Sequence, residues 1–161
     1  MGATKSLANT CVGLLVEAWT VEVHKGQKLV FDLEAELSKH GFFKVGETQA
    51  INWPKKSPAG MKSRPQQVAE ENLYLLQCHT VEDVRALGAD RALKLAITAD
   101  LFRHTAYALQ LFDLMAEAGF IPEVDAKSIR SYIVSKNKVT AVDKLLITLI
   151  HKLKTLQEKR L

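Results

Sequence analysis

The chain has 161 residues, of which 47% are hydrophobic and 25% charged, and it contains only eight glycines and four prolines. This length and balance are those of one globular domain with a single hydrophobic core, and they exclude a long disordered chain. The formal net charge of +4 hides a segregation, because residues 65–126 hold ten acidic and four basic residues, whereas residues 127–161 hold nine basic and two acidic ones.

Two segments with apolar residues at helical spacing open the chain. They cover residues 6–25 and 28–39, and Gly41 followed by Phe42 is typical of the glycine stop that ends a helix. We therefore expect an antiparallel helical hairpin within residues 1–43.

Residues 42–64 break this periodicity and are predicted to form one long basic loop. The segment contains two prolines and two glycines, and residues 44–64 hold five basic residues against one acidic residue. Unstructured connections of about 20 residues are uncommon within compact domains and tend to be functional or disordered. This predicted loop is therefore a candidate functional segment.

Residues 65–161 are predicted to form a helical core that ends in a basic helix. Ser63 followed by Gln66 resembles a capping box and predicts a helix to about residue 79. Thr80 with Asp83 forms a second such pattern and predicts a short helix that ends near residue 88.

The longest helix is predicted to run from Asp90 to Glu117, and it is apolar on nearly all sides, as expected for the centre of a bundle. Asp125 can cap a further helix. Residues 139–156 then carry apolar residues at alternating steps of three and four, a heptad pattern that could pack within the bundle or against another subunit. Ile147 and Ile150 broaden this apolar face and favour burial of a final helix inside the bundle. Together these segments predict an all-α fold, a single-domain bundle of five to six helices over residues 1–161.

Cysteine usage and hydropathy bear on the compartment. Cys11 and Cys78 are far apart, each in an apolar pattern, so neither a disulfide framework nor a zinc site is indicated. The apolar run over residues 7–23 is interrupted by Glu17 and Glu22 and lacks a cleavage-site pattern. We expect no membrane span, no export signal and a cytoplasmic location.

Asp100, Arg103 and His104 form the one candidate group for catalysis. A carboxylate four residues before a histidine on one helix can hold one ring nitrogen and free the other for proton transfer. A local charge network is the simpler interpretation, since no nucleophile is placed beside them. The five histidines lack metal-ligand spacing on a helix, and phosphate-binding glycine motifs are absent. We expect no enzymatic activity, no metal, no cofactor and no small-molecule ligand.

Residues 106–135 can also be interpreted as a helix-turn-helix, with Ala118 and Gly119 at the turn. The connection over residues 120–124 is longer than the three or four residues typical of that motif. The helix-turn-helix is therefore kept only as a minor alternative.

Basic residues with an interleaved tryptophan form the strongest functional pattern. A tryptophan beside lysines suits stacking on an unpaired base while the lysines neutralise phosphates, and a basic final helix adds a second cationic surface. An equally open interpretation is that the tryptophan covers the core and the lysines are solvated. The candidate nucleic-acid-binding residues are Lys44, Trp53, Lys55, Lys56, Lys62, Arg64, Lys127, Arg130, Lys136, Lys138, Lys144, Lys152 and Lys154.

The sequence thus favours a non-enzymatic, helical, nucleic-acid-binding subunit that contacts RNA or DNA without sequence preference. Its setting would be a larger ribonucleoprotein or DNA-processing complex with other protein subunits as partners. The alternative is a protein–protein scaffold or oligomerisation module with charge-segregated surfaces.

Overall fold

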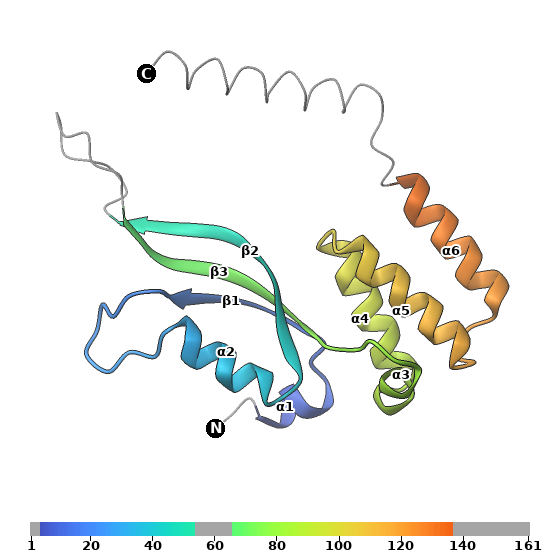
Figure 1. Ribbon diagram of the computed structural model, residues 1–161, viewed down its shortest axis with the longest axis horizontal. Coiled ribbons are helices and arrows are strands. Elements are labelled where there is room, and N and C mark those ends of the chain that lie inside the picture. The colour runs from blue at the N-terminus through green and yellow to red at the C-terminus, as the bar shows by residue number, and fades with distance from the viewer. Residues whose placement is uncertain (1–3, 54–65, 137–161) are drawn as a thin grey trace, which may run out of the picture.

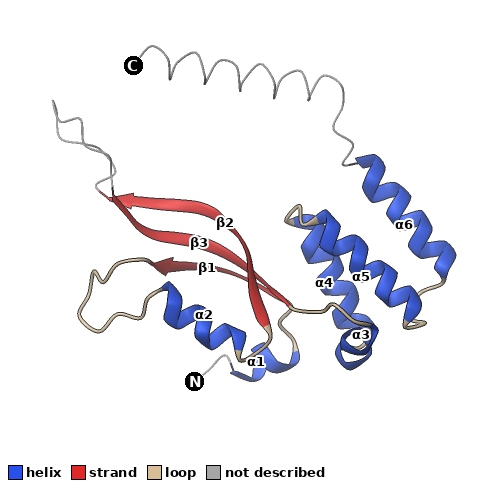
Figure 2. Ribbon diagram, in the orientation of Figure 1, coloured by secondary structure: helices blue, strands red, loops and turns tan. Residues whose placement is uncertain are grey.

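The structure, a computed structural model, describes residues 4–53 and 66–136, and these form a mixed fold of helices and strands (Figure 1). The prediction of an all-α helical bundle is therefore wrong (Figure 2). The elements within the described residues are α1 (Thr4–Asn9), β1 (Gly13–Trp19), α2 (Val30–Ser38), β2 (Phe42–Trp53), β3 (Gln66–Leu76), α3 (Val81–Leu87), α4 (Ala89–Leu101), α5 (Thr105–Glu117) and α6 (Glu123–Lys136).

The three strands form an antiparallel sheet in the order β1-β3-β2. β1 pairs with β3 without interruption, from Gly13 opposite Leu75 to Trp19 opposite Ala69. β2 pairs with the other side of β3 through a register that shifts three times, the first shift falling between Lys44 and Gly46. β3 is therefore the central strand, and β1 and β2 are the two edges.

The strand β1 lies where a helix over residues 6–25 was expected, and only its start, α1, is helical. Leu14 and Val16 pack on the α2 side of the sheet, whereas Gly13 faces Thr98 of α4 on the other side. Apolar residues on both faces of a strand give a nearly continuous apolar run, which periodicity alone does not distinguish from a buried helix.

Two further predictions are wrong within the described residues. The paired strand β2 lies where a loop over residues 42–64 was expected, and β3 lies where a helix ending near residue 79 was expected. β3 is buried on both faces, with Tyr74 on the α2 side and Leu75 against the helices. Its long-range hydrogen bonds to two strands outweigh a local helical pattern, because propensity is a weak preference.

Predictions for the helical half are closer to the structure. The capping box of Thr80 and Asp83 begins α3, and the single helix predicted from Asp90 to Glu117 is split into α4 and α5. The split occurs at Arg103, whose φ is +64°. The N–H groups of Arg103 and His104 donate to the carbonyls of Asp100 and Ala99, which is the Schellman pattern of a helix end.

One buried cluster joins the sheet to the helices. Leu73 and Leu75 of β3 pack with Leu95, Leu111 and Met115 of α4 and α5, all nearly inaccessible to solvent. The sheet and the helices therefore share a core within the described part of the chain. A single domain over residues 1–161 stays a prediction, because residues 137–161 and the final helix expected there lie outside the described residues.

The hydroxyl group of Tyr107 on α5 forms hydrogen bonds with the backbone at the end of β3. It donates to the Leu76 carbonyl at 2.6 Å and accepts from the Cys78 N–H at 2.9 Å, and burial is the main cause that raises its pKa. Tyr107→Phe should lower the free energy of unfolding by about 1–3 kcal/mol, because two buried backbone groups lose their partner. Urea denaturation measures this change, and Tyr132→Phe is the control because Tyr132 is 65% exposed. Equal stabilities of the two variants would contradict the assigned role.

Candidate functional site

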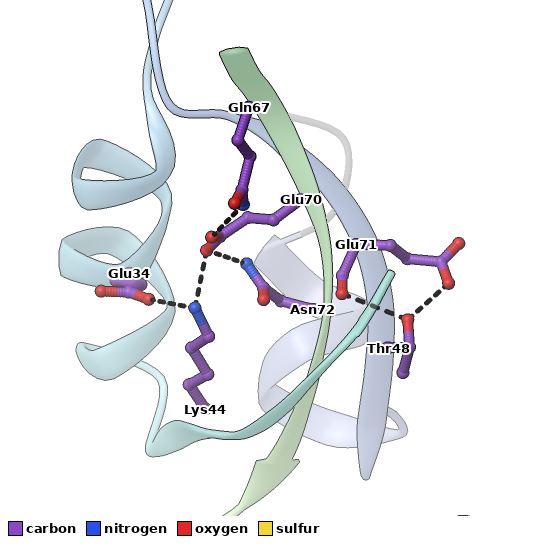
Figure 3. Close-up of polar contacts among 7 residues, drawn as sticks. All are labelled: Glu34, Lys44, Thr48, Gln67, Glu70, Glu71 and Asn72. Atoms are coloured by element: carbon purple, nitrogen blue, oxygen red, sulfur yellow. Dashed lines mark hydrogen bonds and ion pairs between the residues drawn. The ribbon is translucent and has the colours of Figure 1, made fainter. Parts of the chain in front are cut away.

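Lys44, the first cation of the predicted nucleic-acid site, lies in a polar cluster between β2, β3 and α2 (Figure 3). Its Nζ atom lies 2.6 Å from Oε1 of Glu70 and 3.7 Å from Oε1 of Glu34. The Asn72 amide donates to the same Glu70 oxygen at 2.7 Å. Glu70 is only 9% exposed, so this lysine is committed to an internal ion pair.

The electrostatics of the cluster keep both partners charged. Hydrogen bonds from Lys44 and Asn72 lower the pKa of Glu70 although burial opposes them. Burial acts to lower the pKa of Lys44, but the hydrogen bond and charge of Glu70, with the charge of Glu34, raise it overall. Lys44 therefore stabilises the sheet through its ion pair, and its charge is not available to bind a phosphate group.

The other described cations of the predicted site lie on α6, and each is also near a carboxylate. Lys127 lies 2.7 Å from Glu123, and Lys136 lies 3.9 Å from Asp100. Arg130 forms a hydrogen-bonded ion pair with Asp113 of α5. Figure 1 shows α4 and α5 between α6 and the three-stranded sheet, and Lys44 belongs to β2 of that sheet, so the described cations do not form one continuous strip.

The rest of the predicted site is placed only in part. Trp53 is the last residue of β2 and is paired with Gln66. The remaining candidates lie outside the described residues, and these are Lys55, Lys56, Lys62, Arg64, Lys138, Lys144, Lys152 and Lys154.

The catalytic candidate does not assemble. Because α4 ends at Leu101, Asp100 and His104 are not on one helix, and Asp100 lies nearest Lys136. The imidazole of His104 instead approaches β2, its Cε1 lying 3.9 Å from the position that a Cβ would take at Gly46. Within residues 4–53 and 66–136, no hydrogen bond joins Asp100 to His104 and no three His, Cys, Asp or Glu side chains gather as metal ligands.

The helix pair α5 and α6 occurs where the helix-turn-helix was considered. However, Arg130 on its second helix turns back to Asp113 on the first and is not free for a base edge. The pair therefore packs as an ordinary antiparallel hairpin, with Ala126 and Ile133 buried.

The backbone of β1 offers a different kind of site, at the free edge of the sheet. The Thr20 N–H donates to the Val68 carbonyl, and the Leu76 N–H donates to the Val12 carbonyl. These two bonds show that the even-numbered residues of β1 direct their backbone N–H and C=O groups toward β3. In an antiparallel pair, the residues between them direct N–H and C=O outward. The outward backbone groups of Leu15, Glu17 and Trp19 have no hydrogen-bond partner within the described residues.

A groove runs between this edge and α2, and we call it the β1–α2 groove. It encloses about 580 Å³, and its lining includes Val16 and Ala18 of β1 with Leu29 and Leu33 at the facing side of α2. Val30 and Leu37 anchor α2 on the sheet, so the helix is a fixed wall. A regular edge beside an apolar groove is the geometry that accepts an added strand.

The charged residues around the groove neutralise one another. Lys28, before α2, lies 3.8 Å from Asp32 of α2, and Lys39, which follows α2, lies 2.7 Å from Glu36 of the same helix. These are exposed pairs along one helix, which contribute little to stability. The groove therefore has an apolar floor, and the described charged residues at its α2 rim form pairs without net charge. Glu17 also borders the groove, but the alternation of side chains along β1 directs its carboxylate to the opposite face of the sheet.

The opposite edge of the sheet differs. The register of β2 is irregular at three places, and such bulges disrupt the ladder and protect an edge from further pairing. β1 has no such irregularity. Of the two edges, β1 is the one that can accept a strand.

Sequence reasoning missed this site because it assigned β1 to a helix. The available signal was the short run from Gly13 to Trp19, which has a glycine at its start and an aromatic residue at its end and is of strand length. Its edge position could not be read from the sequence, because that depends on which strand lies at the centre.

Comparison with known proteins adds no identity: no family model, curated protein or solved structure matches the chain. Among the helices that the structure describes, none is long and apolar enough to cross a membrane. The function is therefore argued from geometry.

The Lys44–Glu70 pair makes a prediction for acid stability. The pKa of Glu70 is lowered by folding, so its stabilisation is present above the ordinary carboxyl pKa of 4.5 and is lost as the pH falls through the lower folded value. Glu70→Gln should lower the free energy of unfolding by about 1–3 kcal/mol at pH 7, with a difference that shrinks below pH 4.5. Urea titrations from pH 3 to 7 measure it.

Glu36→Gln is the matched control, because it removes a carboxylate from an exposed pair and should change stability little. A Glu70→Gln effect that is the same at pH 3 and pH 7 would contradict the charged pair.

Proposed function

We propose that this protein is a protein-interaction module that binds an extended segment of a partner protein along β1. The segment adds as a fourth strand and lies over the β1–α2 groove. The observation that carries the proposal is the row of backbone groups at Leu15, Glu17 and Trp19 beside that groove, which have no hydrogen-bond partner in the part of the chain that the structure describes. The proposal develops the alternative hypothesis of a protein–protein interaction module and assigns it a defined binding site.

Strand addition has a clear energetic basis here. Each of the three outward residues offers one donor and one acceptor, so an extended segment gains main-chain hydrogen bonds of fixed register. The partner's alternate side chains then point into the groove, where Val16, Ala18 and Leu33 supply apolar contact. Backbone pairing gives affinity, and the groove gives selectivity.

The size of the site supports the same conclusion. A cavity of about 580 Å³ falls within the range of roughly 300–1,000 Å³ that suits a bound ligand of a few residues. Because β1 is held in place by unbroken pairing with β3, its edge is already extended before a partner arrives. Such preorganisation reduces the entropy that binding must overcome.

Nucleic-acid binding stays a prediction that rests on residues outside the described ranges. Every described lysine or arginine of the predicted basic site lies near a carboxylate, which leaves Lys44 and the α6 cations poorly suited to phosphate. The feature that still favours it is the pair Lys55 and Lys56, which follows Trp53 after one proline.

A proline on the edge tests the proposed function. Leu15→Pro removes one outward N–H without breaking a bond to β3, and proline is tolerated on strand edges, so the protein should fold with a nearly unchanged melting temperature. A random heptapeptide library should yield binders of the unmodified protein that Leu15→Pro fails to bind, as measured by fluorescence polarisation.

Leu15→Val is the matched control, because it keeps the N–H and changes the same 48% exposed side chain. If Leu15→Pro and Leu15→Val bind the selected peptides equally, or if the library yields no binder, the edge is not the binding site.

The nucleic-acid prediction has its own test. If it is correct, Lys55→Glu with Lys56→Glu should weaken binding of a 20-nucleotide single-stranded oligonucleotide at least tenfold, and Lys127→Gln should change it little because Lys127 is paired. Polarisation titrations from 50 to 200 mM salt measure both. A flat salt dependence of the unmodified protein would contradict the prediction.

A further inference from the structure

We infer that the segment bound at β1 alternates apolar with basic residues, the apolar ones facing α2 and the basic ones facing the opposite side of the sheet. This inference rests on the proposed function and names the chemistry of its partner. It follows from the different surroundings of the two faces of β1.

An added strand has the same two faces as the strand it joins. Leu14 and Val16 pack on the α2 side of β1, and the side chains between them lie on the side where Gly13 meets Thr98. Partner residues that alternate along the segment therefore meet the groove on one face and the neighbourhood of Glu17 on the other.

The face away from α2 carries an unneutralised acidic pair. Glu17 lies directly opposite Glu71 in the register of β1 and β3. Neither carboxylate has a lysine or arginine within ion-pair distance in the described part of the chain, and the partner of Glu71 is the Thr48 hydroxyl at 2.5 Å. Like charges opposite one another in a sheet are destabilising, so a cation beside them is favoured.

This face also has room for a long side chain. A hollow of about 570 Å³ adjoins Glu17 and is lined by Gln49, Ala50, Ile51 and Asn52 of β2. Lysine or arginine can lay an apolar stem across such a surface while its charge stays near the carboxylates and in water. A short or acidic side chain gains neither contact.

The α2 face selects differently. Its floor is apolar, and the charges at its rim, Lys28 with Asp32 and Lys39 with Glu36, already neutralise each other. A charged partner residue on this side would lose hydration without gaining a free counter-charge. Apolar side chains of moderate size are therefore favoured there.

A second copy of this chain fits the edge poorly. Antiparallel pairing of two β1 strands centred on Glu17, the middle one of the three outward residues, sets Glu17 against Glu17 of the other copy, next to both Glu71 carboxylates. That arrangement adds like charges without a cation. The geometry points to a heterologous basic strand.

Three fluorescent, end-blocked heptapeptides test the inference: Val-Lys-Val-Lys-Val-Lys-Val and the same peptide with Glu or with Gln in place of Lys. The lysine peptide should bind the full chain most tightly, and Glu17→Gln should weaken it about two- to fivefold at low salt. Glu17→Lys should reverse the preference between the lysine and glutamate peptides.

Glu82→Gln is the matched control, because it makes the same change in net charge at an exposed residue of α3 that lines neither hollow beside β1, and it should leave the lysine peptide's affinity nearly unchanged. Equal effects of Glu17→Gln and Glu82→Gln would overturn the inference, and so would equal binding of the three peptides or binding of none.

Leu15→Pro separates this inference from the proposed function. If Leu15→Pro abolishes peptide binding but Glu17→Gln has no effect, the edge is the binding site and the basic preference is wrong. If Leu15→Pro binds the lysine peptide as Leu15→Val does, the proposed function itself is wrong.

Discussion

The two-sided burial of β3 is the constraint on which the rest of the structure depends. Tyr74 and Asn72 face α2, while Leu73 and Leu75 enter the core shared with α4 and α5. A strand buried on both faces must also satisfy its backbone on both sides, which requires a strand at each flank. The positions of β1 and β2 as edges, and therefore the free edge beside α2, follow from this one requirement.

The same packing explains why net charge is a poor guide to the surface of this molecule. Lys44 is drawn into the sheet because Glu70 is nearly buried there and needs a partner of opposite charge. Arg130 similarly holds α6 against Asp113 of α5. Lys44 and Arg130 thus join elements of the fold to one another, whereas two acidic residues, Glu17 and Glu71, remain without a cation among the described residues.

Patterns between residues close in the sequence correctly predicted helices, because helix ends and helix faces depend on nearby residues. The capping box of Thr80 and Asp83 and the helix near residues 28–39 depend on neighbours in the sequence, and both occur. The strands could not be predicted in this way, because pairing of β1 with β3 joins residues that are fifty or more positions apart. Arg103 shows a third case: an exposed, non-glycine residue in the left-handed region ends α4 with the hydrogen bonds of a Schellman motif, and no glycine or asparagine in the sequence marks that position.

The candidate site depends on an asymmetry between the two edges of the sheet. Bulges interrupt the register of β2, and they disfavour the addition of another strand at that edge. β1 pairs regularly with β3 and exposes the backbone groups of its outer side. A regular edge of this kind risks uncontrolled association, and Glu17 limits that risk because it places like charges together when two copies pair about this residue. The same carboxylate favours a basic partner strand. The Glu17 side chain can thus both disfavour pairing between two copies and favour a basic partner segment. Its position on the regular edge of the sheet therefore fits the proposed role of β1 in binding a partner strand.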